Sequence, residues 1–258
     1  MAISQSEYTF LSILAQLSLF PENPTILEFG EQHWHGDVSL DDVKQDVDIF
    51  LPEQAQKVRQ ELGQLMQRQD ERKNFDMAKI VYRLFFNYQN LTAIDLHGTE
   101  NSLPLDLNHE ISLGQEFDIS INFGTGEHVF NVCQFFKTIH DCTKSGGIML
   151  HVMPFLGWMD HGFFNFQPTI YWDLAESNHY EVLAFLFING KQFFHLADRQ
   201  AVTQYLMALR LEPQKCSVIP SNIYVAMRKT EEPTDFQIPM QKFFQMTPEE
   251  YWSMSKDF

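Results

Sequence analysis

Short apolar stretches alternate with longer amphipathic ones along most of the chain. Apolar residues at three- and four-residue spacing predict helices, whereas short runs of β-branched and aromatic residues between turn signals predict strands. We expect strands at 25–30, 91–97, 102–107, 117–124, 148–154, 181–188 and 221–229. We expect helices at 4–20, 53–71, 75–88, 128–147, 168–178 and 197–211. Strands that alternate with helices indicate βαβ units, and therefore an α/β fold with a mostly parallel sheet and helices on both faces.

The chain is long enough for one domain with a full core. It has 258 residues, 44% of them hydrophobic, and no linker rich in Pro, Gly or Ser divides it. We therefore expect a single domain over 1–258. Residues 4–20 form an N-terminal helix, residues about 35–74 form an insertion over the site, and the polar tail, about 230–258, forms a cap with aromatic anchors.

Charge and cysteine content exclude several classes of function. A net charge of −16 repels phosphate backbones and anionic lipids, so we expect neither a nucleic-acid nor a membrane partner. Three cysteines without a C-x-x-C pair predict neither a disulfide framework nor a cysteine zinc site. The N-terminal apolar stretch lacks a preceding Lys or Arg, and no run approaches the roughly 20 residues of a membrane helix. We expect a cytoplasmic protein.

Acidic residues and glycines stand where the predicted strands end. In parallel sheets, ligands bind beyond the carboxyl ends of the strands, where the strand order switches. Asp95 ends the second strand, and a carboxylate there can accept hydrogen bonds from both hydroxyls of a ribose. Gly30 ends the first strand and allows a ligand to approach the backbone closely. The alternative is that each acid only caps the following helix; the ordered set favours a nucleoside-type cofactor.

The strand-end motifs resemble those of class I S-adenosylmethionine-dependent methyltransferases, from about Thr25 to Lys229. The similar motifs are ILEFG, AIDLHG, PLDLN, FDISINFGTGEHVFN and KSGGIMLHVMP. The resemblance implies a Rossmann-like sheet of seven strands with the last one antiparallel. It implies S-adenosyl-L-methionine as cofactor, bound by Glu28, Gly30, Asp95, Leu96, Asp106, Leu107, Asn122 and Phe123. Glu31-Gln32-His33 follows Gly30 where the family usually has further glycines, so this loop is bulkier than in the family.

The connection after the fifth strand holds the candidate catalytic residues. In the family this connection lies beside the transferred methyl group, where apolar rings can exclude water and a base can remove a proton. The candidates are His161, His151, Asp160, which could orient His161, and His128 after the fourth strand. The alternatives remain open: Phe163, Phe164 and Phe166 can simply pack the loop onto the sheet, and each histidine can be structural.

Three other functions compete with methyl transfer to a small molecule. His33 and His35 form an H-x-H after a strand, which resembles the first metal motif of hydrolase barrels, although seven strands are too few for such a barrel. The bulky loop is compatible with a non-catalytic scaffold, and other S-adenosylmethionine chemistry is also open. We expect methylation of a small-molecule biosynthetic intermediate, with oxygen or nitrogen acceptors favoured, no metal, and a homodimer as an open possibility.

Overall fold

The computed structural model describes residues 2–189, 191–211, 221–232, 234–245, 247 and 249. The elements in chain order are β1 (Ala2–Ile3), α1 (Gln5–Gln16), β2 (Thr25–Phe29), β3 (His33–Trp34), α2 (Leu40–Phe50), η1 (Pro52–Gln54), α3 (Ala55–Gln67), α4 (Lys73–Phe86), β4 (Asn90–Ile94), β5 (Ser102–Leu103), β6 (Phe117–Phe123), η2 (Gly126–His128), α5 (Val132–Cys142), β7 (Thr143–Leu156), α6 (Thr169–Asn178), β8 (Glu181–Asn189), β9 (Gln192–His195), α7 (Arg199–Leu211), β10 (Ser221–Arg228) and η3 (Lys242–Gln245).

An eight-stranded sheet with the order β5-β4-β2-β6-β7-β10-β8-β9 forms the centre of the molecule. The strands from β5 to β7 are parallel, and β10 runs antiparallel between β7 and β8. The first strand of this sheet, β2, therefore lies between the second, β4, and the fourth, β6, as in doubly wound Rossmann sheets. This arrangement confirms the predicted mostly parallel sheet. It has one strand more than predicted, because β9 pairs with β8 in a hairpin.

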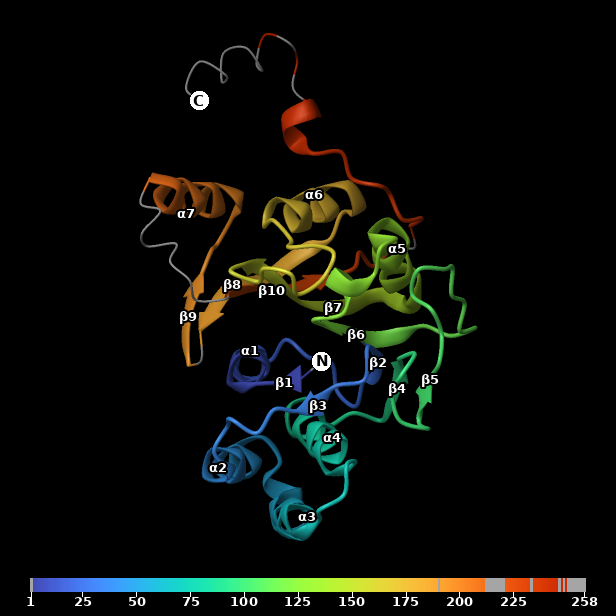
Figure 1. Ribbon diagram of the computed structural model, residues 1–258, viewed down its shortest axis with the longest axis vertical. Helices are drawn as coiled ribbons and strands as arrows, with labels where there is room; N and C mark the ends of the chain where they lie inside the picture. Colours follow the sequence, from blue (N-terminus) through green and yellow to red (C-terminus); the bar gives the residue numbers. More distant parts are fainter. Residues whose placement is uncertain are drawn as a thin grey trace.

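Helices cover both faces of the sheet. Helices α1 to α4 lie on one face, and α5 and α6 lie on the other (Figure 1). Side chains of successive strand residues point to opposite faces, so one strand serves two cores. In β2, Ile26 packs in the core under α1–α4, whereas Leu27 and Phe29 pack in the core under α5 and α6.

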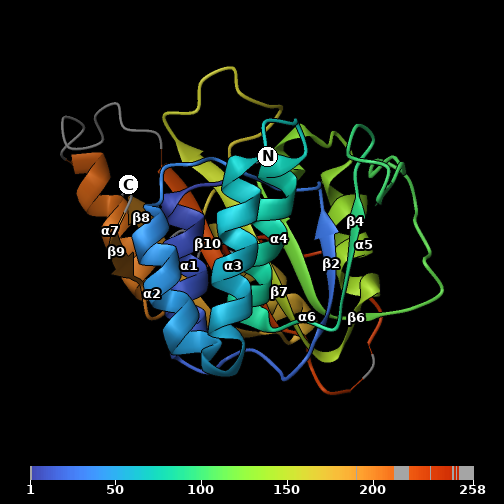
Figure 2. The ribbon, with the colours of Figure 1, turned by 90° about the horizontal axis from the view of Figure 1, so that it is seen from below.

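The segment 35–74, expected as an insertion, forms α2, η1 and α3. These helices lie beside α1 and α4 on one face of the sheet, as the view from below shows (Figure 2). Val43 and Val47 of α2 and Val58 and Leu62 of α3 are fully or almost fully buried, so both helices belong to the core of this face.

The predicted C-terminal cap is described only in part. Residues 234–237 contact the helices α5 and α6: the carbonyl of Thr234 lies 2.8 Å from Nε2 of His140, and Asn178 accepts the N–H of Gln237 at 2.7 Å. Residues 250–258 lie outside the described residues.

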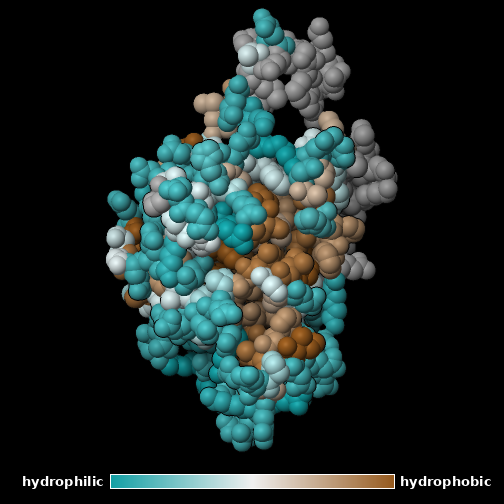
Figure 3. Space-filling model, turned by 180° about the vertical axis from the view of Figure 1, so that it is seen from behind, coloured by the Kyte–Doolittle hydropathy of each residue, from teal (hydrophilic) through white to brown (hydrophobic). Residues whose placement is uncertain are grey.

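Two further observations concern the sequence-based expectations. Cys133 and Cys142 are free thiols, and Cys216 lies outside the described residues. Among the described residues, no helix combines the length and the apolar character needed to cross a membrane. The surface seen from behind is mostly hydrophilic around one apolar patch (Figure 3).

Candidate functional site

The carboxyl ends of β2, β4 and β6 bring the predicted cofactor residues to one edge of the sheet. Phe29 pairs with Ile94 on one side and with Asn122 on the other, so Gly30 follows between Asp95 and Phe123. The strand order reverses at β2, which is where doubly wound sheets bind their ligands. Four of the eight predicted cofactor-binding residues therefore lie around this switch point: Gly30, Asp95, Asn122 and Phe123.

Asp95 is held rigidly at this edge by the backbone. Its Oδ2 accepts the N–H of Glu31 at 2.9 Å, and its Oδ1 accepts the N–H of His97 at 2.8 Å. An ionised carboxylate offers about four acceptor positions. About two acceptor positions of Asp95 therefore remain for a ligand.

The bulky loop after Gly30 is folded tightly onto its neighbours. Gly30 has a φ of 83°, which favours glycine. The side chain of Glu31 turns away to accept hydrogen bonds from the N–H and the hydroxyl of Thr99, at 2.6 and 2.9 Å. The amide of Gln32 donates to the carbonyls of Gly30 and Phe123, at 3.1 and 3.0 Å, so it links the ends of β2 and β6. Its Oε1 is buried without a hydrogen-bond partner in the described residues.

Glu28 points toward the helices α1–α4, because it lies on the same side of β2 as Ile26. Its carboxylate accepts the hydroxyl of Tyr82 on α4 at 2.8 Å. Burial raises the pKa of Glu28 to about 8, and the hydrogen bond from Tyr82 opposes this rise. In this position Glu28 stabilises the packing of α4 on β2, and its expected contact with the cofactor stays a prediction.

The residues expected to contact the adenine lie on two loops. Leu96 is exposed after β4, and Leu107 is buried after β5. Asp106 accepts hydrogen bonds from the backbone and the side-chain amide of Asn108, each at 2.9 Å, which lower its pKa. Asn108 in turn accepts the N–H of Asn131 at 3.0 Å, so this loop is tied to the start of α5.

A cavity of about 440 Å³ lies next to the switch point, at the carboxyl ends of β6 and β7. Its wall comes from the N-terminal segment before and within α1, from the turns after β6 and β7, and from β8 and β10. Phe123 belongs both to this wall and to the switch-point edge. The volume is that of a small-molecule site.

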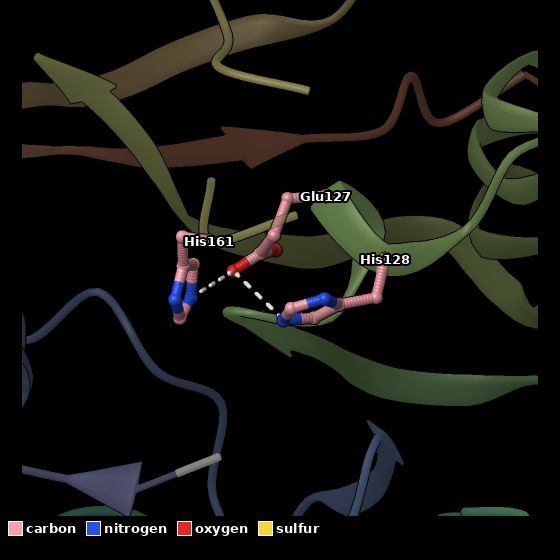
Figure 4. A group of neighbouring side chains, drawn as sticks. All are labelled: Glu127, His128 and His161. Carbon is pink, nitrogen blue, oxygen red and sulfur yellow. Dashed lines mark ion pairs between the residues drawn. The ribbon is translucent and has the colours of Figure 1, made fainter. Parts of the chain in front are cut away.

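Three side chains that can exchange protons meet in this cavity: Glu127, His128 and His161 (Figure 4). Oε1 of Glu127 lies 3.8 Å from Nε2 of His128 and 3.7 Å from Nε2 of His161. Glu127 is 2% exposed, and its Oε2 has no hydrogen-bond partner in the described part of the chain. Burial raises the pKa of Glu127 to about 7, and burial together with the neighbouring His161 lowers the pKa of His128.

The loop 157–168 docks on Glu127 through a turn. The carbonyl of Glu127 accepts the N–H of Phe163 at 2.8 Å, and a Cβ on Gly162 would lie 2.8 Å from the same oxygen. Asp160 has a φ of 58° in this turn. The carboxylate placed beside His161 by the described contacts is therefore that of Glu127, whereas Asp160 was the residue expected from the sequence.

The aromatic residues of this loop lie in three different places. Trp158 lines the cavity, with its ring centroid 4.8 Å from that of His161, and its indole N–H donates to the carbonyl of Ser221 at 3.2 Å. Phe166 packs in the core against Phe136. Phe163 and Phe164 contact Phe130, away from the residues that line the cavity.

His151 lies in the core rather than in the cavity wall. It is 1% exposed, its Nδ1 lies 3.2 Å from the amide nitrogen of Asn122, and its ring contacts Phe136 and Tyr171. Burial lowers its pKa to about 3. Asn122 also accepts the backbone N–H of Thr125 and Gly126, so this pair supports the turn that carries Glu127.

Glu127, His128 and His161 are also the group of potential metal ligands found in the described residues. Their ligand atoms lie within 4.8 Å of one another. His33 and His35 are not part of it: His33 packs on Phe75, whereas His35 lines the cavity. The open sheet also differs from the hydrolase barrel that the H-x-H alternative requires.

Sequence reasoning missed Glu127 and Gln32. Both follow glycines at the ends of strands, and Glu127 directly precedes His128, which was a candidate. The signal was an acid beside a histidine in the turn after the fourth strand. The sequence offered no reason to assign a role to Glu127, because its partner, His161, lies 34 positions further along the chain.

Comparisons with known proteins give only distant structural likeness. No family model and no curated protein matches the sequence. Solved structures with a similar fold include the N-methyltransferase NodS from Bradyrhizobium japonicum WM9 in complex with S-adenosyl-L-homocysteine. The two sequences are 12% identical, the match covers 86% of this chain and 85% of that chain, and the TM-score is 0.45. They also include a methyltransferase, named as putative, from Bacillus halodurans C-125, with 12% identity, 85% and 98% covered, and a TM-score of 0.47.

A third similar structure is the O-methyltransferase of a trans-AT PKS multienzyme of Brevibacillus brevis with S-adenosyl-L-homocysteine. It has 11% identity, 98% of this chain and 83% of that chain covered, and a TM-score of 0.44. At these values the likeness does not extend to a cofactor or a substrate, which are inferred below from the residues of this chain.

Proposed function

We propose that this protein is a class I S-adenosylmethionine-dependent methyltransferase that acts on an oxygen or nitrogen of a small molecule. The observation that supports it most is the junction of two half-sites at Phe123. On one side, Gly30 and Asp95 flank the switch point of the sheet. On the other side lies the cavity that contains Glu127 and His161.

The residues at the switch point are suited to the cofactor. Asp95 would hold the ribose hydroxyls, Gly30 would allow close approach, and the unpartnered Oε1 of Gln32 would accept a hydrogen bond from the amino group of the methionine part. When bound there, S-adenosylmethionine supplies an electrophilic methyl group on a sulfonium.

The residues of the cavity prepare the acceptor. His161 lies against the ring of Trp158, and its Nε2 is 3.7 Å from Oε1 of Glu127, so a carboxylate faces the nitrogen that would take the proton. Loop 157–168 covers this part of the cavity and excludes water from the acceptor. His161, with Glu127, is the proposed proton acceptor, and His128 is the second imidazole of the same cluster.

Calorimetric titration with S-adenosylmethionine and S-adenosylhomocysteine tests the proposal. We expect micromolar binding of both, and we expect Asp95→Ala to weaken it ten- to a hundredfold, because a hydrogen bond to a charged group contributes about 1.5–3 kcal/mol. Glu181→Gln, an exposed carboxylate at the start of β8, is the matched control and should leave the affinity unchanged. No binding at millimolar ligand would reject the methyltransferase function in favour of a scaffold.

A further inference from the structure

In the cavity next to the switch point, the carboxylate of Glu127 has no matching hydrogen-bond donor among the described residues. Oε1 of Glu127 is too far from both imidazoles for a hydrogen bond, at 3.7 and 3.8 Å, and Oε2 has no partner. Figure 4 shows the carboxylate pointing between the two rings. The described residues that line the cavity include no Lys or Arg. A buried carboxylate without a donor is costly, so a positively charged ligand beside Glu127 would be stabilising.

The second carboxylate of the cavity does not share this deficit. Glu7 accepts the hydroxyl of Tyr224 at 2.9 Å and the N–H of Ser4 at 3.0 Å, as part of the capping box of α1. Its hydrogen bonds come from the protein, and its charge still adds to the negative potential of the cavity. A cation bound in the cavity would therefore contact Glu127 and not Glu7.

The spacing of the cluster can be compared with the spacings that an ammonium group and a metal ion require. Tetrahedral ligands of a zinc ion, at about 2.1 Å from it, lie about 3.4 Å from one another. Acceptors around an ammonium nitrogen, at about 2.8 Å from it, lie about 4.6 Å apart in the same geometry. The atoms of this cluster are 3.7 and 3.8 Å apart for two pairs, and all three lie within 4.8 Å. Both separations lie between the two values and closer to that of zinc, so the spacing admits either occupant. The unpartnered Oε2 of Glu127 among the described residues and the ring of Trp158 favour the ammonium group.

We propose that the methyl acceptor is an aliphatic amine, bound as its ammonium ion with its N–H groups directed at Glu127, His128 and His161. This inference rests on the proposed methyltransferase function and specifies its substrate class. Imidazoles that carry their proton on Nδ1 accept through Nε2, so one carboxylate and two rings match the three donors of a primary ammonium. Trp158, in the same wall, adds an aromatic surface that attracts cations.

The same contacts provide the proton transfer that amine methylation requires. Desolvation lowers the pKa of a buried ammonium, which favours transfer of one of its protons to the side chains that it contacts. The ammonium gives one proton to the cluster, and its nitrogen lone pair then forms the bond to the methyl carbon. The bond from that carbon to sulfur breaks with its electron pair remaining on sulfur, so S-adenosylhomocysteine and a methylammonium product result.

A binding experiment on the whole protein tests the substrate class. The protein saturated with S-adenosylhomocysteine would be titrated with primary amines from methylamine to phenethylamine. The alcohol and the carboxylate with the same carbon skeleton would be titrated in the same way. At least one amine should bind ten times more tightly than its alcohol, and its carboxylate should not bind. Glu127→Gln should abolish this preference while S-adenosylhomocysteine still binds, and Glu181→Gln should change neither.

The outcomes separate this inference from the function on which it rests. If every amine binds as weakly as its alcohol or more weakly, while S-adenosylhomocysteine binds, the amine is refuted as the acceptor and the methyltransferase function is not. Amine binding without any binding of S-adenosylhomocysteine would refute the methyltransferase and leave a cation site. Binding of one Zn²⁺ or Mn²⁺ per chain that displaces the amines and is lost in Glu127→Gln would identify a metal site instead. The comparison of amine with alcohol needs no variant, so it holds even if Glu127→Gln does not fold.

Discussion

At the scale of single residues, His161 is the side chain whose role in the chemistry is most directly testable. It lies beside the carboxylate of Glu127 and against the ring of Trp158. His161→Ala should lower kcat by about a hundredfold or more, because a positioned base contributes about 10²- to 10⁴-fold. The affinity for S-adenosylhomocysteine should change less than twofold.

The measurement is kcat from S-adenosylhomocysteine release, together with calorimetry for cofactor affinity. His195→Ala, an exposed residue of β9 at the far edge of the sheet, is the control and should retain the rate. An unchanged rate in His161→Ala would leave His161 as a structural residue of the turn.

The sequence predicted which residues lie at the switch point better than which residues line the cavity. Gly30, Asp95 and Phe123 were predictable because strand ends in a parallel sheet meet at one edge, whatever the helices do. Glu127 was not, since its significance depends on a turn of a distant loop. His151 ends a predicted strand in the same way as Asp95, but the sequence does not show which face of β7 it occupies.

At the scale of elements, Gly162 couples the loop 157–168 to the turn that carries Glu127. A Cβ at this position would lie 2.8 Å from the carbonyl oxygen of Glu127, which is a backbone atom, so one of the two segments must shift. Gly162→Ala should therefore displace the turn and move His161 from the carboxylate. We expect kcat to fall about tenfold or more, with the affinity for S-adenosylhomocysteine kept.

The control for this substitution is Gly63→Ala in α3, where an added Cβ meets nothing within 4 Å. It should raise the free energy of unfolding by about 0.5–1 kcal/mol, since glycine is unfavourable inside a helix, and leave kcat unchanged. If Gly162→Ala behaves in the same way, the docking of the loop has no part in the chemistry.

Elements with a strong apolar pattern were predicted closely, and the others were not. The strand predicted at 117–124 is β6 at Phe117–Phe123, because its alternating apolar residues are buried. Helix α2 was expected only as part of the insertion at about 35–74, because its apolar positions are few and its surface is acidic. β9 was missed although Asn189-Gly190, a typical hairpin signal, precedes it. The predicted helix 128–147 ends at Cys142, because Thr143–Gly147 begin β7.

At the scale of the whole molecule, the buried ionisable groups determine how stability depends on pH. Burial raises the pKa of Glu28 to about 8 and that of Glu127 to about 7, so both bind protons more tightly in the folded state than in the unfolded state. Their contribution to the free energy of unfolding is fully present below the unfolded pKa of about 4.5, and it is lost as pH rises through the folded pKa values of about 7 and 8. His151 acts oppositely, because its folded pKa of about 3 makes protonation below about 6.5 favour unfolding.

Because two carboxyl groups outweigh one histidine, the two effects together predict a maximum of stability near pH 4.5. Between about pH 4.5 and 6.5 the two carboxyl groups and His151 oppose one another and leave a net release of one proton on unfolding, whereas above 6.5 only the carboxyl groups act. Stability should then fall by up to about 1.4 kcal/mol per pH unit for each proton released on unfolding, and the net charge of −16 adds repulsion in the same direction.

Urea unfolding between pH 5 and 9 measures this dependence. The double variant Glu28→Gln/Glu127→Gln should flatten the alkaline limb, since neither amide titrates, while the Tyr82 hydrogen bond to position 28 is kept. An alkaline limb as steep in the double variant as in the wild type would assign the loss of stability to the surface charge rather than to these two buried carboxyl groups.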